Sequence, residues 1–271
     1  WIDSRGRDTA ALLAQDVASG TTRVIAENSK ADVRSTLTNP KSGEVEAYSV
    51  TYLRQQWTAV DPNVGADLVW LTEQLGGDVN VTSRTDDDRL WTVAVDTVVA
   101  SPSVHLFDRQ ARTLTQLYVS RPELEGAPLQ RMYPLELKAR DGLTLPSYLT
   151  LPPGSDPDGH GKPAAPLPMV LFVHGGPWAR DGYGYNPMHQ WLANRGYAVL
   201  AVNYRGSTGF GKSFIEAGNL QWGRKMHDDL LDAVKWAVAQ GIADGKRVAI
   251  MGGSYGGYAT LAGLAFTPEV F

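Results

Sequence analysis

The residues 252–256 read Gly-Gly-Ser-Tyr-Gly, a Gly-x-Ser-x-Gly pattern centred on Ser254. This pattern is typical of the sharp turn that presents a nucleophilic serine between a strand and a helix. Residues 246–251 form a short apolar run that suits a buried strand, and residues 258–266 suit a helix. The sequence therefore predicts that Ser254 is the nucleophile of an acyl-transfer reaction, rather than an exposed serine in a glycine-rich turn.

A second motif supplies the groups that would stabilise the oxyanion of that reaction. The apolar run 169–173 is followed by His174-Gly175-Gly176-Pro177. Lipases and esterases carry a similar segment after an early strand, and one of its backbone N–H groups forms half of the oxyanion hole. The other half is the N–H of the residue after the nucleophile, here Tyr255. We expect Gly176 to supply the first donor, with Gly175 as the alternative.

The acid and base of a serine triad are not evident in the sequence. In the α/β-hydrolase fold they follow the serine in the order Ser, Asp or Glu, His. Ser254 is followed by one carboxylate, Glu269, and by no histidine. His174 precedes the serine by 80 residues (254 − 174), which is the wrong chain order for a base, so we expect it to shape the loop. The chain alone is therefore expected to be inactive.

These motifs together resemble the prolyl oligopeptidase family of serine peptidases, most closely its acylaminoacyl-peptidase and dipeptidyl-aminopeptidase branch. The resemblance is carried by residues 174–177, by Asn-Tyr-Arg-Gly-Ser-Thr-Gly-Phe-Gly at 203–211, and by Gly-Gly-Ser-Tyr-Gly-Gly-Tyr at 252–258. It implies a mixed fold, in which a partial, all-β propeller precedes the N-terminal half of an α/β-hydrolase domain. It also implies Ser254 as nucleophile, with Tyr255 and Gly176 as oxyanion donors. The chain is expected to be a fragment lacking the N-terminal propeller blades and the C-terminal part of the hydrolase domain.

Residues 1–128 read as the partial propeller and residues 129–271 as the truncated hydrolase domain. The first region consists of short apolar runs separated by turn residues, with no helical periodicity. The segments around Asp16 and Asp108 are similar and lie 92 residues apart (108 − 16), twice the length of a four-stranded blade of about 46 residues. An irregular β-sandwich is the alternative. In the second region strands alternate with helices, which predicts parallel strands covered on both faces.

The candidates for lining the substrate cleft are His174, Trp178 and Arg205. Arg205 follows a predicted strand, where it would bind a substrate carboxylate or brace the loop through backbone carbonyls. Trp178 follows the oxyanion loop and would line the cleft or pack in the core or on the surface. The acidic run 86–88 predicts a solvated hairpin turn, because its spacing matches no calcium loop. Trp57, Trp70 and Trp91 are expected to pack between blades.

Composition narrows the remaining classes of function. The net charge is −4 with no basic stripe, which makes nucleic acid an unfavourable partner. No apolar stretch approaches the length of a membrane span, and the absence of cysteine excludes disulfides and thiolate metal sites. No metal or cofactor is expected, and the oligomeric state and the compartment stay open. The leading hypothesis is a serine exopeptidase acting on oligopeptides; a carboxylesterase of the same fold and a non-catalytic propeller fragment that binds a partner are the alternatives.

Overall fold

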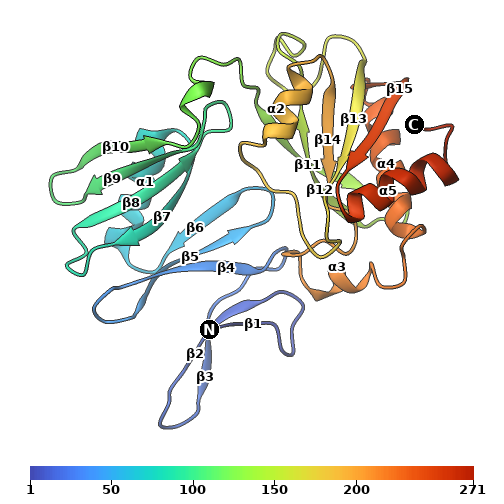
Figure 1. Ribbon diagram of the computed structural model, residues 1–271. Helices are drawn as coiled ribbons and strands as arrows, with labels where there is room; N and C mark the ends of the chain where they lie inside the picture. The colour runs from blue at the N-terminus through green and yellow to red at the C-terminus, as the bar shows by residue number, and fades with distance from the viewer. The chain divides into compact units, whose positions relative to one another are not determined.

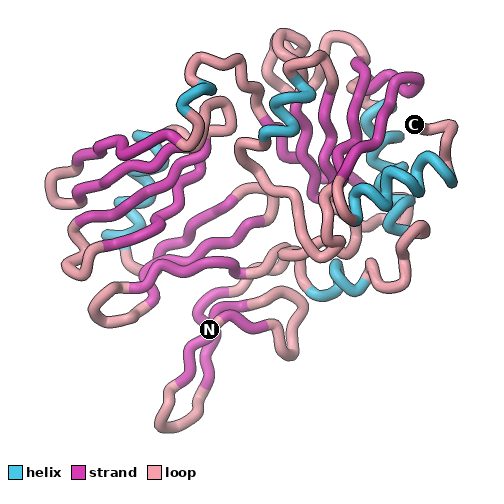
Figure 2. The backbone as a smooth tube through the Cα atoms, in the orientation of Figure 1, coloured by secondary structure: helices cyan, strands magenta, loops and turns pink.

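In the computed structural model, which describes residues 1–271, the chain forms two units, Trp1–Ala127 and Pro128–Phe271. The first consists of small antiparallel sheets, and the second is built on one mixed sheet flanked by helices (Figures 1 and 2). No helix in either unit has both the length and the apolar character that a membrane span requires.

The first unit contains three sheets in which strands adjacent in the sequence pair with each other. Their strands are β1 (Ile2–Asp3), β2 (Ala11–Gln15) and β3 (Thr22–Ala26); β4 (Val33–Thr38), β5 (Val45–Thr51) and β6 (Gln55–Ala59); and β7 (Asp78–Arg84), β8 (Leu90–Asp96), β9 (Ser103–Asp108) and β10 (Thr113–Val119). Burial alternates along β8, where Trp91, Val93 and Val95 face the core. This period of two is what a sheet with one buried face requires.

A helix interrupts this β-rich unit, so the expectation that residues 1–128 contain no helix is wrong. Helix α1 spans Pro62–Leu75 and buries Val64, Leu68 and Leu71. Both ends of the helix have common capping residues. The carboxylate of Asp61 accepts hydrogen bonds from the backbone N–H groups of Asn63 and Val64, and Gly76 adopts a left-handed conformation after the last turn. The apolar residues of α1 join the sheets β4–β6 and β7–β10 in one hydrophobic cluster.

The hairpin between β7 and β8 holds the acidic run 86–88, and one of its carboxylates is not solvated as expected. Asp86 and Asp87 are exposed, whereas Asp88 turns inward with a φ of 58°. The Asp88 carboxylate accepts bonds from Arg84, from Arg109 and from the indole N–H of Trp91. Both guanidinium groups also lie over the Trp91 ring, 4.7 and 4.5 Å from its centroid. Trp91 is fully buried in this cluster, and Trp57 and Trp70 are partly buried against it.

The second unit has one five-stranded sheet in the order β11-β12-β14-β13-β15. The strands are β11 (Met132–Lys138), β12 (Thr144–Thr150), β13 (Leu167–Val173), β14 (Ala198–Val202) and β15 (Ala243–Gly252). β13 runs parallel to β14 and β15, as the alternating pattern predicted, while β11, β12 and β14 pair antiparallel. Every residue of the central strand β14 is buried, which explains its continuous apolar sequence.

Helices cover this sheet on both sides (Figure 1). They are α2 (Pro187–Ala193), α4 (Lys225–Ala239) and α5 (Tyr255–Phe266). The short helix α3 (Lys212–Glu216) lies beyond the end of the sheet (Figure 1), and a 3₁₀ turn, Pro122–Leu124, lies in the first unit. Asn186 caps α2 and Pro187 begins it. The face of α4 that meets the sheet repeats at helical spacing and buries Met226, Leu230 and Val234. α2 contacts β12 and β14, and α5 follows β15 directly and packs on it.

Candidate active site

Ser254 occupies a tight turn between β15, which ends at Gly252, and α5, which begins at Tyr255. Its backbone has φ 55° and ψ −121°, a conformation that costs free energy for any residue with a side chain. The side chain is exposed at the start of the helix, with no hydrogen-bond partner for its hydroxyl. The strand–turn–helix geometry inferred from the pattern is therefore present.

β13 approaches this turn so closely that two of its positions have no room for a side chain. A Cβ on Gly256 would lie 2.1 Å from the carbonyl oxygen of Val173, and one on Gly252 would lie 2.4 Å from the same atom. Real Cβ atoms do not come so near to backbone, so only glycine fits at either position. Gly253, by contrast, faces open space. The turn is thus held by the packing of two parallel strands, and Val173 pairs with Gly252 where those strands end.

The loop after β13 rests directly on the serine turn. A Cβ built on Gly175 would lie 3.2 Å from the carbonyl oxygen of Gly253 and 3.3 Å from Cβ of Ser254. Gly176 follows with φ +119°, a value that favours glycine. Tyr255 is the first residue of α5, where backbone N–H groups have no intrahelical partner. Ser254, Tyr255 and the Gly175–Gly176 loop therefore meet at one edge of the sheet.

His174 lies behind this loop rather than beside the serine hydroxyl. Its Nδ1 lies 2.7 Å from the carbonyl oxygen of Gly175, which can only accept, so Nδ1 carries the proton. Its Nε2 lies 2.9 Å from the hydroxyl of Ser207, and its ring stacks on Tyr204 at 4.4 Å. Burial lowers the pKa of His174 to about 4, which keeps the ring neutral. These contacts support the shape of the loop.

The other histidines are also engaged away from Ser254. Nδ1 of His189 lies 3.1 Å from the Thr150 hydroxyl, and Nε2 of His227 lies 3.0 Å from the Thr267 hydroxyl. His105 contacts Ser103 in the first unit, and the His160 side chain is exposed. No histidine or carboxylate of the chain is hydrogen-bonded to the Ser254 hydroxyl.

Arg205 is buried in a network of ion pairs. Its guanidinium donates to both oxygens of Asp229, at 2.8 and 2.6 Å, and to both oxygens of Asp141, at 2.9 and 3.1 Å. The backbone N–H of Arg205 also donates to Asp229, at 2.9 Å. The bonds from Arg205 hold the pKa of Asp141 well below its usual range. Of the two roles considered for Arg205, this arrangement favours bracing, with carboxylates rather than carbonyls as the partners.

The aromatic residues around the turn divide into buried and exposed groups. Tyr255 turns its ring into the unit, where it packs on Tyr204 at 5.1 Å and on Trp222 at 4.8 Å. Trp178, in contrast, is 64% exposed, so it is a surface residue of the loop after β13 and not part of the core. Tyr204 carries a role that the sequence did not reveal, because its hydroxyl donates to the carbonyl of His174 at 2.9 Å and ties two strand ends together.

Asp181 is a second residue that the sequence did not single out. Its Oδ2 is buried and has no hydrogen-bond partner. Burial raises the pKa of this carboxyl to about 7, although the neighbouring Arg180 opposes the shift. No spacing rule would have found it, because its isolation results from the way the loop folds.

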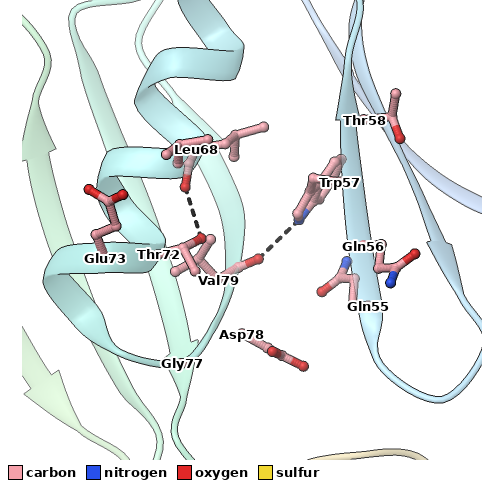
Figure 3. A pocket seen from close by; sticks show the side chains of 11 residues that line it. Gln55, Gln56, Trp57, Thr58, Leu68, Thr72, Glu73, Gly77, Asp78 and Val79 are labelled. Carbon is pink, nitrogen blue, oxygen red and sulfur yellow. Dashed lines mark hydrogen bonds between the residues drawn. The ribbon is translucent and has the colours of Figure 1, made fainter.

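A cavity of about 610 Å³ lies wholly within the first unit and includes none of these residues. Its walls come from β6, α1 and the beginning of β7 (Figure 3). The indole N–H of Trp57 donates to the carbonyl of Val79 at 3.0 Å and so joins β6 to β7 beside the cavity (Figure 3). Its lining is mixed, with Gln56, Thr58 and Glu73 next to Leu68.

Known proteins match the chain over its whole length. Residues 184–271 match the model of the prolyl oligopeptidase family. Dipeptidyl aminopeptidase BIII of Pseudoxanthomonas mexicana is 58% identical over 271 residues, which are all of this chain and 39% of that protein. The human acylamino-acid-releasing enzyme is 31% identical over 232 residues, 80% of this chain and 30% of that protein.

Among solved structures, the dipeptidyl peptidase 4 of Porphyromonas gingivalis aligns with a TM-score of 0.73 at 20% identity, over 100% of this chain and 38% of that one. The chain thus spans about two fifths or less of the length of the proteins it matches. Both branches named by the sequence resemblance appear among its relatives. Its residues 184–271 thus match the prolyl oligopeptidase family, and the chain as a whole is similar to dipeptidyl aminopeptidases and acylamino-acid-releasing enzymes.

Proposed function

We propose that this chain carries the nucleophile and the oxyanion hole of a serine peptidase that acts near the N-termini of short peptides. The observation that carries the proposal is the backbone of Ser254, held at φ 55° between a strand and a helix with Gly175 packed against it. Such strain is retained where it presents a reactive group. The similarity to proteins named for dipeptidyl and acylaminoacyl release supports a peptide substrate.

In the proposed reaction the Ser254 hydroxyl loses its proton to a base and attacks the carbonyl carbon of the scissile peptide bond. The oxyanion accepts hydrogen bonds from the N–H of Tyr255 and from that of Gly176 or Gly175. Collapse of the tetrahedral intermediate breaks the C–N bond, and the leaving amine takes up the proton. Water then hydrolyses the acyl-enzyme and frees Ser254.

The base and the acid that orients it are assigned to residues outside these 271. Each histidine of the chain is engaged elsewhere or lies in the first unit or an exposed loop, and the Ser254 hydroxyl has no partner. The chain by itself is therefore expected to have at most the residual activity that an oxyanion hole and binding give without a triad.

We also propose that the three small sheets of the first unit are blades of a partial β-propeller. Asp16 and Asp108 support this proposal because they occupy equivalent places in two of the sheets. Asp16 directly follows β2 and Asp108 ends β9, and in each case the next strand is the last of its sheet. Each carboxylate accepts a backbone N–H of the hairpin that leads to that last strand. The sheet β7–β10 has four antiparallel strands, the number that a propeller blade requires.

The test compares the complete gene product with its Ser254→Ala variant on a peptide anilide and on a short acyl ester. The proposal expects peptide hydrolysis that falls by about 10⁶-fold in kcat in the variant. Equal activity of the variant would overturn the assignment of Ser254. Cleavage of the ester alone would make the protein a carboxylesterase. Normal turnover by the 271-residue chain would overturn the assignment of the base.

A further inference from the structure

Tyr204 lies where the carboxyl ends of three parallel strands meet. It is the second residue after β14 and is fully buried. β14 lies beside β13, which lies beside β15, so the loops that leave these strands share one edge of the sheet. The Tyr204 ring stacks on His174 at 4.4 Å and packs on Tyr255 at 5.1 Å. Tyr204 therefore contacts both segments that would supply oxyanion donors.

The hydroxyl of Tyr204 fixes the direction of one candidate donor. It donates to the carbonyl of His174 at 2.9 Å. Burial raises the pKa of this phenol, so the hydroxyl keeps its proton and acts as the donor. A trans peptide group is planar, and its C=O and N–H point in opposite directions. The bond to the His174 carbonyl therefore also sets the direction of the Gly175 N–H, which points away from Tyr204.

The next peptide group is held in the same way by the His174 ring. Its Nδ1–H donates to the carbonyl of Gly175 at 2.7 Å, so the N–H of Gly176 points away from the ring. The ring is fixed by its stacking on Tyr204 and by the hydroxyl of Ser207, which lies 2.9 Å from Nε2. The same hydroxyl lies 2.7 Å from the carbonyl oxygen of Tyr204. The contacts that orient both N–H groups of this loop thus converge on Tyr204.

Tyr255, which would supply the other donor, is held through its ring. It is the first residue of α5, and its side chain is buried against Tyr204 and against Trp222, 4.8 Å away. Trp222 also packs on Tyr258 in the same helix, at 5.1 Å. A buried ring packed on two neighbours leaves little freedom to the residue that carries it. These contacts therefore hold the first turn of α5 in place.

We propose that Tyr204 is a positioning residue that aligns the two halves of the oxyanion hole, the Gly175–Gly176 loop and the N–H of Tyr255. This inference rests on the proposed function. In this role Tyr204 acts through its neighbours and not on the reacting atoms. A displacement of about 1 Å in a catalytic group can lower the rate by about 100-fold. Because the oxyanion forms only during the reaction, loss of alignment should lower kcat and leave substrate binding nearly unchanged.

The first test compares Tyr204→Phe with Tyr133→Phe in the complete gene product. Each substitution removes one hydroxyl and keeps the ring, and the Tyr133 hydroxyl bonds Asp156 at 2.8 Å in the same unit. We expect Tyr204→Phe to lower kcat on a peptide anilide by about 10- to 100-fold and to change KM by less than about 3-fold. Tyr133→Phe should leave both constants unchanged. An unchanged kcat in Tyr204→Phe, or a loss confined to KM, would overturn the inference.

A second test addresses the Tyr255 half and uses partly exposed positions. Trp222 and Trp191 are both 48% exposed, so alanine at either position removes an equally exposed indole from the same unit. We expect Trp222→Ala to lower kcat by about 3- to 10-fold with KM nearly unchanged, and Trp222→Phe to restore most of the loss. Trp191→Ala should have no effect on either constant. Equal effects of the two alanine variants would contradict the role given to the packing of the Tyr255 ring.

Labelling with a peptidyl diphenyl phosphonate separates failure of this inference from failure of the proposed function. Oγ of Ser254 attacks phosphorus, the P–O bond to one phenoxide breaks, and the phenoxide takes up the serine proton. The phosphoryl oxygen then occupies the place of the oxyanion. Mass spectrometry measures the rate at which Ser254 is modified.

The inference predicts that Tyr204→Phe is labelled about 10- to 100-fold more slowly than the wild type, with Tyr133→Phe labelled at the wild-type rate. Equal rates in Tyr204→Phe and the wild type would overturn the inference and leave the proposed function intact. A wild type that is not labelled at Ser254 would overturn both.

Discussion

The two units stabilise their sheets by different means. In the second unit helices cover the mixed sheet, β14 is buried along its whole length, and the principal buried ion pairs are those of Arg205 with Asp229 and Asp141. In the first unit the sheets are small, and arginines connect them. Arg84 bonds Glu46 on the neighbouring sheet, and Arg109 bonds Asp67 on α1. The broad apolar burial of the second unit stabilises it enough to offset the cost of strained and unpaired groups at the strand ends. The candidate site lies at these strand ends.

The largest expected effect comes from the serine turn, where packing is tightest. Gly256→Ala would place a Cβ at 2.1 Å from the Val173 carbonyl oxygen, so we expect it to lower the free energy of unfolding by about 5 kcal/mol. Urea unfolding measures the change. Gly253→Ala is the matched control, because its Cβ would meet nothing within 4 Å. Equal losses in the two variants would show that the structure has the wrong contacts at this turn.

The next effect concerns the buried ion pairs of the second unit. Arg205→Ala leaves Asp229 buried without a partner and should cost about 4 kcal/mol. Arg247→Ala is the control, since Arg247 pairs with Asp244 at 2.7 Å and the two side chains are 56% and 34% exposed. We expect less than about 1 kcal/mol for this exposed pair. A small loss at Arg205, measured by the same unfolding experiment, would mean that the unit does not depend on the network.

A pH effect should also belong to the second unit. Burial lowers the pKa of His189 from 6.5 to about 4. As the pH falls from about 6.5 to 4, the unfolded chain therefore binds a proton at this residue that the native protein does not bind. Stability from this group is complete above pH 6.5 and is lost below it. His189→Gln should reduce the fall in unfolding free energy between pH 7 and pH 4 by about 3 kcal/mol. His160→Gln, at an exposed position, should leave that fall unchanged; a parallel response of both variants would reject this explanation.

The smallest effect tests the arginine network of the first unit. Asp88→Asn keeps a side chain that tolerates positive φ but removes the charge shared by Arg84 and Arg109, so we expect a loss of about 2 kcal/mol. Asp86→Asn, in the same turn but exposed, should change stability by less than about 0.5 kcal/mol. If the two substitutions have the same effect, the network contributes nothing beyond a surface charge.

The units also differ in how far their sequences predict them. In the second unit the turn at Ser254 could be located from local residues, because its glycines and its flanking strand and helix are all consecutive. The role of His174 in shaping its loop also followed from chain order. The partners of Arg205 could not be predicted, since Asp141 and Asp229 lie on other elements and only the fold brings them together.

In the first unit the sequence consists largely of short apolar runs separated by turn residues, and this pattern does not predict helix α1. The signals of that helix were present: Asp61 and Pro62 at its beginning and Gly76 at its end. The segments on either side have the period of strands, so this stretch is also read as part of a β-rich region. Asp88 shows a different limit, because a carboxylate in an acidic turn looks solvated until Trp91 and two arginines fold around it. Asp181 is unpaired for the same kind of reason, which no local pattern records.

The order of strands in the second unit has a consequence for how the protein folds. Neighbouring strands of the first unit are joined by short hairpins, whereas Val170 of β13 pairs with Ala249 of β15, about 80 residues later. Closing so long a loop costs chain entropy before any contact compensates it, so this pairing should be a late event. The Gly175 loop meets the Ser254 turn only once these two strands are side by side. Substitutions that weaken β15 should therefore reduce the yield of folded molecules more than the activity of each molecule that folds.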